Sequence, residues 1–416
     1  MSGSKRKLGT AAGVVVLGFV ATGCGGSDVS AGAESDAVNL NRCFGADCGL
    51  RAQSLSGEDV LARPCGEVEG PLADPVVFED IEGGLMVMAA VEGAEGSVWA
   101  LQIERGLSRG EGPLNLVHFA ADGSRLATLE VGTETDHTVL QAALAVDSTG
   151  LVTIGIYSSY APNADATLTE ELELSTFDSD LVAVGAPAKF RGMSAPQLLS
   201  GPNGSIWLAG NAAANASHGV ISRVSQGEPD WIQTAVPASG TATGVSGLAV
   251  ADDGNAAVLA GLTGKWSGTG PDLMKVGIST FDVTGKPLWT LKLPTDYTPG
   301  WVPALGGSAQ GDLVVVGAVG ENGQQLLARR VSRDGELGWA YTIEGSGPGV
   351  DVRRDSGRAF VAAFNRVAVI DAEGTACRQF SVAIDEASKA AAEPWRPDGE
   401  YLLAVGSGLV RFRVPE

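Results

Sequence analysis

The sequence predicts an all-β fold, and one bias in composition and two recurring patterns lead to this prediction. Glycine accounts for 58 of 416 residues and separates short apolar runs, which indicates many short strands joined by tight turns. A turn glycine followed by an apolar run recurs, as after Gly254, and so does a glycine followed four residues later by tryptophan, as at Gly285 and Trp289. Together the patterns describe a four-stranded sheet that repeats along the chain.

Seven glycines mark the turns between the first two strands of successive units. They are Gly96, Gly150, Gly204, Gly254, Gly311, Gly357 and Gly399. A repeat of about 40 to 50 residues with four short strands is typical of a propeller blade. We therefore expect a seven-bladed β-propeller of four-stranded blades over residues 61–416. A two-sheet sandwich is the alternative, but it leaves the repeated four-strand unit unexplained.

The strands can be placed unit by unit, with A to D denoting their order. In unit one we expect them near Leu85–Val91, Ser97–Ile103, Leu114–Phe119 and Arg125–Val131. In unit two we expect them near Leu140–Val146, Leu151–Tyr157, Leu172–Phe177 and Leu181–Ala186. Units three to six turn at the pairs Gly204 and Gly227, Gly254 and Gly285, Gly311 and Gly335, and Gly357 and Gly374. Unit seven turns at Gly399 and ends with a third strand near Leu409–Val414.

Unit seven is expected to lack a fourth strand of its own, because the sequence stops at Glu416. The segment Pro75–Asp80, just ahead of unit one, has the right place to supply that strand. It would close the ring and leave no open sheet edge, which is a liability in β proteins.

Residues 1–23 have the pattern of a signal peptide. Lys5-Arg6-Lys7 precedes the apolar run Leu8–Val20, which is too short to span a bilayer comfortably. The next residues, Ala21-Thr22-Gly23-Cys24, resemble a bacterial lipobox, which implies that Cys24 is lipidated, with palmitate among its acyl chains, and becomes the first residue of the mature protein. We therefore expect an exported lipoprotein, anchored to a membrane of the bacterial cell envelope through Cys24. An ordinary signal peptide cut near the same place is the alternative.

Residues 24–60 are rich in Gly, Ser, Ala and Asp, and we expect a flexible tether there. Cys43 and Cys48 lie within this segment. A zinc site would need more thiols or histidines nearby, and the three histidines of the chain lie far away in sequence. In an oxidising compartment a local disulfide between Cys43 and Cys48 is the better interpretation.

Cys65 and Cys377 are the remaining cysteines, and we predict a disulfide between them. Cys377 lies early in strand D of unit six. The spare strand Pro75–Asp80 would be strand D of the neighbouring unit seven, and Cys65 precedes it closely enough to reach the same edge. The bond would pin the ring-closing segment to the last complete blade. Two buried free thiols are the alternative.

The string Asp282–Trp289, with Asp, Gly285 and Trp289 at fixed offsets, resembles the repeat of quinoprotein-like (PQQ-type) β-propellers. Only units three, four and five carry the tryptophan, so the resemblance implies a fold more than a function. We expect Trp231, Trp289 and Trp339 to wedge between neighbouring blades. Members that hold quinone and calcium also use a pair of adjacent half-cystines. This sequence has no Cys-Cys pair, so we expect no cofactor and no metal.

The net charge of −21 excludes most nucleic-acid partners, because phosphates repel an acidic surface. It fits a soluble acidic exported protein, and a specific cationic partner is an alternative without further support in the sequence. The sequence contains no Gly-x-Ser-x-Gly elbow and no phosphate loop. Asp252-Asp253 and Asp178 with Asp180 could ligate calcium, but capping of tight turns is the simpler interpretation.

Long loops between the strands of units two and four carry the best candidates for ligand contacts. These are Tyr160, Trp266, Tyr297 and Trp301. Aromatic side chains on loops of a rigid scaffold are common in binding sites. The alternative is that they only cover the ends of the strands. We expect a monomeric, non-enzymatic binding or scaffold module for a protein or glycan; the alternative function is an envelope hydrolase or lyase with carboxylates in the central funnel.

Overall fold

The computed structural model describes residues 38–39, 53–56, 60–72, 76–79, 85–104, 114–131, 138–160, 169–191, 193–212, 219–225, 228–234, 244–263, 275–298, 303–320, 323–354, 356–363, 366–382, 396–398, 401–405 and 409–413. The chain divides into two units, Met1–Asp36 and Ala37–Glu416, and all of these residues lie in the second. They form β-strands joined by turns, with two short 3-10 turns at Ala94–Gly96 and Pro202–Gly204. The all-β prediction is therefore confirmed for the described residues.

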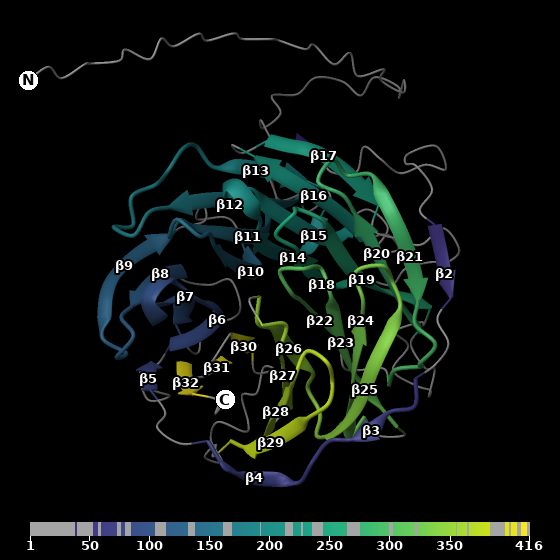
Figure 1. The fold of residues 1–416 in the computed structure, drawn as a ribbon. Coiled ribbons are helices and arrows are strands. Elements are labelled where there is room, and N and C mark those ends of the chain that lie inside the picture. Colours follow the sequence, from purple (N-terminus) through teal and green to yellow (C-terminus); the bar gives the residue numbers. More distant parts are fainter. Residues whose placement is uncertain are drawn as a thin grey trace, which may run out of the picture. The chain divides into compact units, whose positions relative to one another are not determined.

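The strands of the first three sheets follow one another in chain order (Figure 1). Sheet 1 contains β6 (Leu85–Glu92), β7 (Val98–Glu104), β8 (Leu114–Phe119) and β9 (Arg125–Val131). Sheet 2 contains β10 (Thr138–Val146), β11 (Val152–Tyr160), β12 (Thr169–Phe177) and β13 (Ala188–Arg191). Sheet 3 contains β14 (Met193–Ser200), β15 (Ile206–Ala212), β16 (Gly219–Ser225) and β17 (Glu228–Thr234).

The later sheets repeat this order. Sheet 4 contains β18 (Gly244–Val250), β19 (Ala256–Thr263), β20 (Lys275–Phe281) and β21 (Pro287–Lys292). Sheet 5 contains β22 (Ala304–Gly307), β23 (Leu313–Val319), β24 (Gln325–Val331) and β25 (Leu337–Glu344). Sheet 6 contains β26 (Gly349–Val352), β27 (Ala359–Ala363), β28 (Arg366–Ile370) and β29 (Cys377–Ser381). Sheet 7 contains β30 (Arg396–Asp398), β31 (Tyr401–Val405) and β32 (Leu409–Arg413).

The sheets pack through their first strands, because each of β6, β10, β14, β18, β22 and β26 contacts the first strand of the next sheet. Apolar side chains of neighbouring sheets then form shared clusters, such as that of Val314 and Trp339 in sheet 5 with Val361 in sheet 6. Repeated antiparallel sheets that bury both faces against their neighbours are the architecture of a β-propeller. The first strand is the innermost of each sheet and the fourth is the outermost.

Short N-terminal strands pair with the outermost strands. They are β1 (Val38–Asn39) on β13, β2 (Gln53–Ser56) on β21, β3 (Arg63–Pro64) on β25 and β4 (Val68–Pro71) on β29, all parallel, and β5 (Val76–Glu79) on β32, antiparallel. We call β2 to β5 the strap; Figure 1 shows its strands beside those outermost strands. The strand expected at Pro75–Asp80 is thus present, and two stretches of the expected tether form strands instead. Residues 38–39 and 53–56 are too short and too polar to show a strand period.

The predicted tryptophan wedges are confirmed. Each of the three indoles lies in the seam between two sheets. It donates its N–H to a backbone carbonyl in the turn between the third and fourth strands of the next sheet. The pairs are Trp231 to Val283 at 3.1 Å, Trp289 to Arg333 at 2.9 Å and Trp339 to Ala372 at 3.0 Å. A Cβ at Gly285 or Gly374 would overlap the neighbouring indole, so Trp231 and Trp339 each rest on a bare glycine turn. At Gly335, the turn beside Trp289, a Cβ would overlap Leu55 of β2 instead.

Of the Asp residues that could have ligated calcium, Asp178 and Asp253 cap their turns, as the turn interpretation predicts, whereas Asp252 accepts a hydrogen bond from Arg354. Asp282 caps its turn in the same way. Asp282 accepts the backbone N–H groups of Thr284 at 2.9 Å and Lys286 at 3.0 Å, and Asp178 accepts those of Asp180 and Val182. Burial, the largest single influence, raises the pKa of Asp282, but the hydrogen bonds from Thr284 and Lys286 together outweigh it and lower that pKa. The carboxylates are therefore parts of the turns.

The seam between sheets 1 and 2 is built differently. His118 on β8 stacks on Trp99 of β7, with ring centroids 3.9 Å apart. Burial lowers the pKa of His118, and a hydrogen bond with the backbone of Ser179 in sheet 2 opposes this shift only in part. The folded protein therefore favours the neutral imidazole.

We expect the stability of the protein to fall when His118 becomes charged. Because the folded pKa is depressed, the contribution is complete above the unfolded pKa of 6.5 and is lost as the pH falls below it. His118→Phe keeps an aromatic ring on Trp99 but does not titrate. Urea unfolding between about pH 7.5 and pH 5.5 should show a larger loss of unfolding free energy for the wild type than for His118→Phe. Parallel pH profiles would contradict this prediction.

Candidate functional site

The aromatic residues predicted to bind a ligand have different outcomes. Trp266 and Trp301 lie outside the described residues, and of Tyr160 only the backbone is described, at the end of β11 opposite Thr169. Tyr297 is 0% exposed and packs in a core cluster with Trp289 and Leu305. For Tyr297 the prediction of a binding residue is therefore wrong.

Tyr297 is buried because sheet 5 leaves space for its ring. Gly317 on β23 has no side chain, and a Cβ there would overlap the tyrosine ring. The next residue, Thr298, is held in place by two bonds: its N–H donates to Ala318 at 2.8 Å and its hydroxyl to Gly320 at 2.7 Å. The loop after β21 thus covers the end of sheet 5, which is the alternative that the sequence left open.

The strap is a structural element that the sequence analysis predicted only in part. Side chains of the strap pack into seams between sheets or against a single sheet. Leu55 packs in the core cluster of sheets 4 and 5, and Leu72 is buried beside Phe360 and Phe380 of sheet 6. Phe78 packs on Phe119 of sheet 1 with ring centroids 5.7 Å apart. The strap therefore binds through side chains as well as through backbone pairing.

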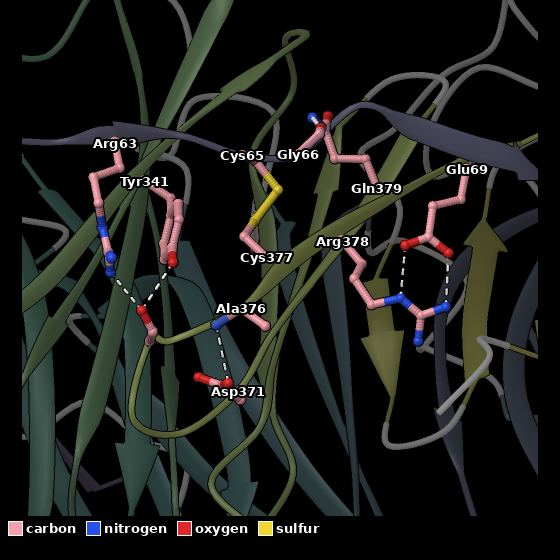
Figure 2. The surroundings of a disulfide bond; sticks show 11 residues. Arg63, Cys65, Gly66, Glu69, Tyr341, Asp371, Ala376, Cys377, Arg378 and Gln379 are labelled. Carbon is pink, nitrogen blue, oxygen red and sulfur yellow. Dashed lines mark hydrogen bonds and ion pairs between the residues drawn. A yellow bond between two sulfur atoms is a disulfide. The ribbon is translucent and has the colours of Figure 1, made fainter.

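A disulfide joins the strap to sheet 6, and it is the Cys65–Cys377 pairing that the sequence predicts (Figure 2). The Cα atoms are 5.1 Å apart, and the two residues are separated by 312 positions. Cys65 donates its backbone N–H to Thr342 of sheet 5 at 2.9 Å, and Gly66 donates to Cys377 at 3.1 Å. The alternative of two free thiols is therefore excluded here.

Polar contacts flank the disulfide on both sides (Figure 2). Arg63 and the hydroxyl of Tyr341 both donate to the carbonyl of Gly374, the latter at 2.8 Å. On the other side Glu69 and Arg378 form two hydrogen bonds of 2.7 and 2.8 Å. The hydrogen bond from Arg378 lowers the pKa of Glu69. Both side chains are exposed to solvent, so this pair positions the strap more than it stabilises it.

Acidic groups are sparse on the innermost strands as far as these are described. They are Glu92 on β6, Asp351 on β26 and Asp398 on β30. Within the described ranges no group of three or more His, Cys, Asp or Glu residues could hold a metal ion. Among the same residues there is also no helix long and apolar enough to cross a membrane. Cys24, Cys43 and Cys48 lie outside the described residues, so lipidation at Cys24 and a Cys43–Cys48 disulfide stay predictions.

No family model and no curated protein matches the chain. Solved structures resemble it in fold at low identity. A gluconolactonase from Xanthomonas campestris is 14% identical, with 78% of this chain and 97% of that chain covered and a TM-score of 0.39. An α-L-arabinofuranosidase from Fusarium graminearum is 12% identical, with 83% and 98% covered and a TM-score of 0.44. The WD40 domain of SCAP from fission yeast is 9% identical, with 82% and 97% covered and a TM-score of 0.44. These proteins differ in activity, and their names assign none to this chain.

We expect the Cys65–Cys377 bond to contribute strongly to stability. In the chain-entropy model, a closed loop of this length restricts the unfolded chain by about 5 kcal/mol as an upper figure. Cys65→Ser with Cys377→Ser should lower the unfolding free energy by up to that amount. Cys43→Ser with Cys48→Ser, whose bond would close only a short loop, is the matched control and should lose clearly less. Urea unfolding without reductant measures both.

Peptide mapping of the native oxidised protein checks the pairing itself. A Cys65 that is alkylated, or linked to Cys43 or Cys48, would contradict it. Equal losses of stability in the two double variants would contradict the loop-length argument.

Proposed function

We propose that this protein is a lipid-anchored β-propeller of the bacterial cell envelope that acts, as a monomer, as a non-enzymatic binding or scaffold module for a protein or glycan. In this proposal its seven sheets are the blades of one closed ring. The strap strand β5 serves as the fourth strand of the last blade, and a lipid on Cys24 attaches the mature chain to a membrane.

Contacts between the last and first sheets support the closure. Arg411 on β32 is 5% exposed and donates to the carbonyls of Gly96 and Ala121 in sheet 1, both at 2.6 Å. Its guanidinium also lies 5.1 Å from the ring centroid of Phe78 on β5. A buried guanidinium needs partners of this kind, because an unpaired buried charge is costly. Arg411, on a third strand, thus links two sheets through turn carbonyls, as the tryptophans on fourth strands do in the middle seams.

The strap is the observation that carries the proposal. An anchor acts through the N-terminal part of the chain, and here that part is paired with sheets 4 to 7 and cross-linked to sheet 6. A force on the N-terminus is then borne by strand pairing and a disulfide, and the sheets stay packed. This suits a rigid module held at a membrane for recognition. Tyr160, Trp266 and Trp301 remain our candidates for contacts at the loop ends of the sheets.

Replacing the predicted acylated cysteine tests the anchor. Cys24→Ala should leave the protein without acyl label and move it from the membrane fraction to the soluble fraction of the cell. Cys43→Ala removes a cysteine of the same N-terminal segment and is the control; it should stay with the membranes and keep its label. Acyl labelling with membrane fractionation measures both. Unchanged labelling and fractionation of Cys24→Ala would refute the lipid anchor.

A further inference from the structure

The exposed apolar side chains gather at one end of the sheets. Among the described residues, Leu61 and Val68 of the strap are exposed large apolar residues, and so is a second group away from the strap. That group is Leu126, Val182, Val184, Leu199, Val283 and Leu288. All of these lie at or next to the turns between first and second or third and fourth strands, in sheets 1 to 4. We call this end the turn face.

The largest exposure on the turn face, that of Val182, occurs where the outermost strand of sheet 2 is interrupted. The sequence predicts this strand at Leu181–Ala186, but β13 begins only at Ala188. Leu181 and Gly185 have positive φ angles, 62° and 81°, and the segment between them makes only an isolated bridge from Ala183 to Phe177. The segment is therefore held to β12 at this bridge but does not form a continuous ladder with it, and Val182 and Val184 are 59% and 45% exposed.

The interruption opens a groove between sheets 2 and 3. This cavity has a volume of about 330 Å³, and its lining includes Leu174, Val184, Ala188, Ile206 and Val224. The backbone at the edge of the groove is held in place at Val184, because the N–H of Val184 donates to the carbonyl of Thr176 at 2.8 Å. A preformed concave apolar site of this size suits one large side chain of a partner.

The charges around the groove are acidic. Asp147 lines it, and Asp178 and Asp180 lie in the adjoining turn. In the described part of the chain no ion pair involves these carboxylates. The basic residues of the neighbouring strands are engaged elsewhere: Lys189 lies 3.3 Å from Glu171, and Arg223 lies 3.2 Å from Asp230. The groove is thus lined mainly by apolar side chains, with Thr153 and Thr176 among them, and it is negative at its rim, in a chain of net charge −21.

We propose that the groove between sheets 2 and 3 docks a cationic protein segment, which inserts one aromatic or large aliphatic side chain between Val184 and Ile206. The acidic rim selects lysine and arginine beside that anchor through charge complementarity. This inference rests on the proposed function, since it names the partner and the surface of the binding module. It places recognition on the turn face, in addition to the loop ends.

A pair of peptide probes tests the proposal with the full chain purified in detergent. The first is a lysine-rich peptide with one central tryptophan, and the second replaces that tryptophan with alanine. Fluorescence anisotropy should show that the tryptophan peptide binds about tenfold more tightly, because the anchor fills the groove. A glutamate-rich peptide with the same tryptophan should bind more weakly still. Added salt should weaken only the lysine-rich peptides.

Variants of exposed residues locate the binding. Val184→Ser and Ala186→Trp, the latter filling the groove, should each weaken the tryptophan peptide by about tenfold. Asp180→Asn should weaken both lysine-rich peptides and leave their ratio unchanged. Val283→Ser, an exposed valine of the turn face outside the groove, is the matched control and should bind as the wild type does. Circular dichroism checks that each variant is folded.

Three results would overturn the proposal. The first is unchanged peptide binding by Val184→Ser and Ala186→Trp, and the second is binding of the glutamate-rich peptide as tight as that of the lysine-rich tryptophan peptide. The third is a preference of the wild type for maltohexaose, a neutral oligosaccharide, that is lost in Val184→Ser. The last result would assign the groove to a glycan. These outcomes are separate from the anchor test, because the peptides are measured in detergent. If the protein binds the peptide but is not lipidated, the groove proposal stands and the anchor proposal is refuted.

Discussion

An indole that rests on a bare glycine turn is the contact on which the packing of the middle sheets depends. A four-stranded sheet cannot bury its two faces alone, so each sheet needs a fixed position against the next one. Trp231, Trp289 and Trp339 supply this position between sheets 3 and 6, each with one hydrogen bond to a turn carbonyl and a large buried ring. At Gly285 and Gly374 the glycine is required for two reasons, because it provides both the positive φ angle and the space for the ring.

The ends of the repeat use other chemistry for the same purpose. The stacked pair His118 and Trp99 packs between sheets 1 and 2, and Arg411 and Phe78 pack between sheets 7 and 1. The strap then covers the outermost strands of sheets 4 to 7, where open edges would invite pairing with other chains. The Cys65–Cys377 disulfide fixes the position of the strap on sheet 6. The same N-terminal segment therefore pairs with four sheets and leads to the predicted lipid anchor.

Much of the architecture could be predicted because glycine and tryptophan mark the turns directly. Gly285 with Trp289 placed a turn and a seam, and the position of Cys65 ahead of the spare strand placed the disulfide. The strands at 38–39 and 53–56 could not be predicted, since a short polar strand on an outer edge gains most of its stability from backbone pairing. Tyr297 was misplaced for a similar reason: its burial depends on Gly317, a residue of another sheet. The interruption of sheet 2 at Leu181 likewise has no signal, because a positive φ at leucine is rare.

The central claim, that the indoles hold the sheets in position, can be measured at two turns that share one sequence pattern. Asp282 to Gly285 and Asp147 to Gly150 both have Asp, Thr and Gly at the same offsets, and the φ angles of the two glycines are 82° and 88°. A Cβ on Gly285 would overlap Trp231, whereas a Cβ on Gly150 would meet nothing within 4 Å. Both Gly→Ala variants share the backbone cost of about 1 to 2 kcal/mol. If the seam matters, urea unfolding will show Gly285→Ala to be less stable than Gly150→Ala by about a further 1 to 3 kcal/mol. Equal losses in the two variants would contradict the account.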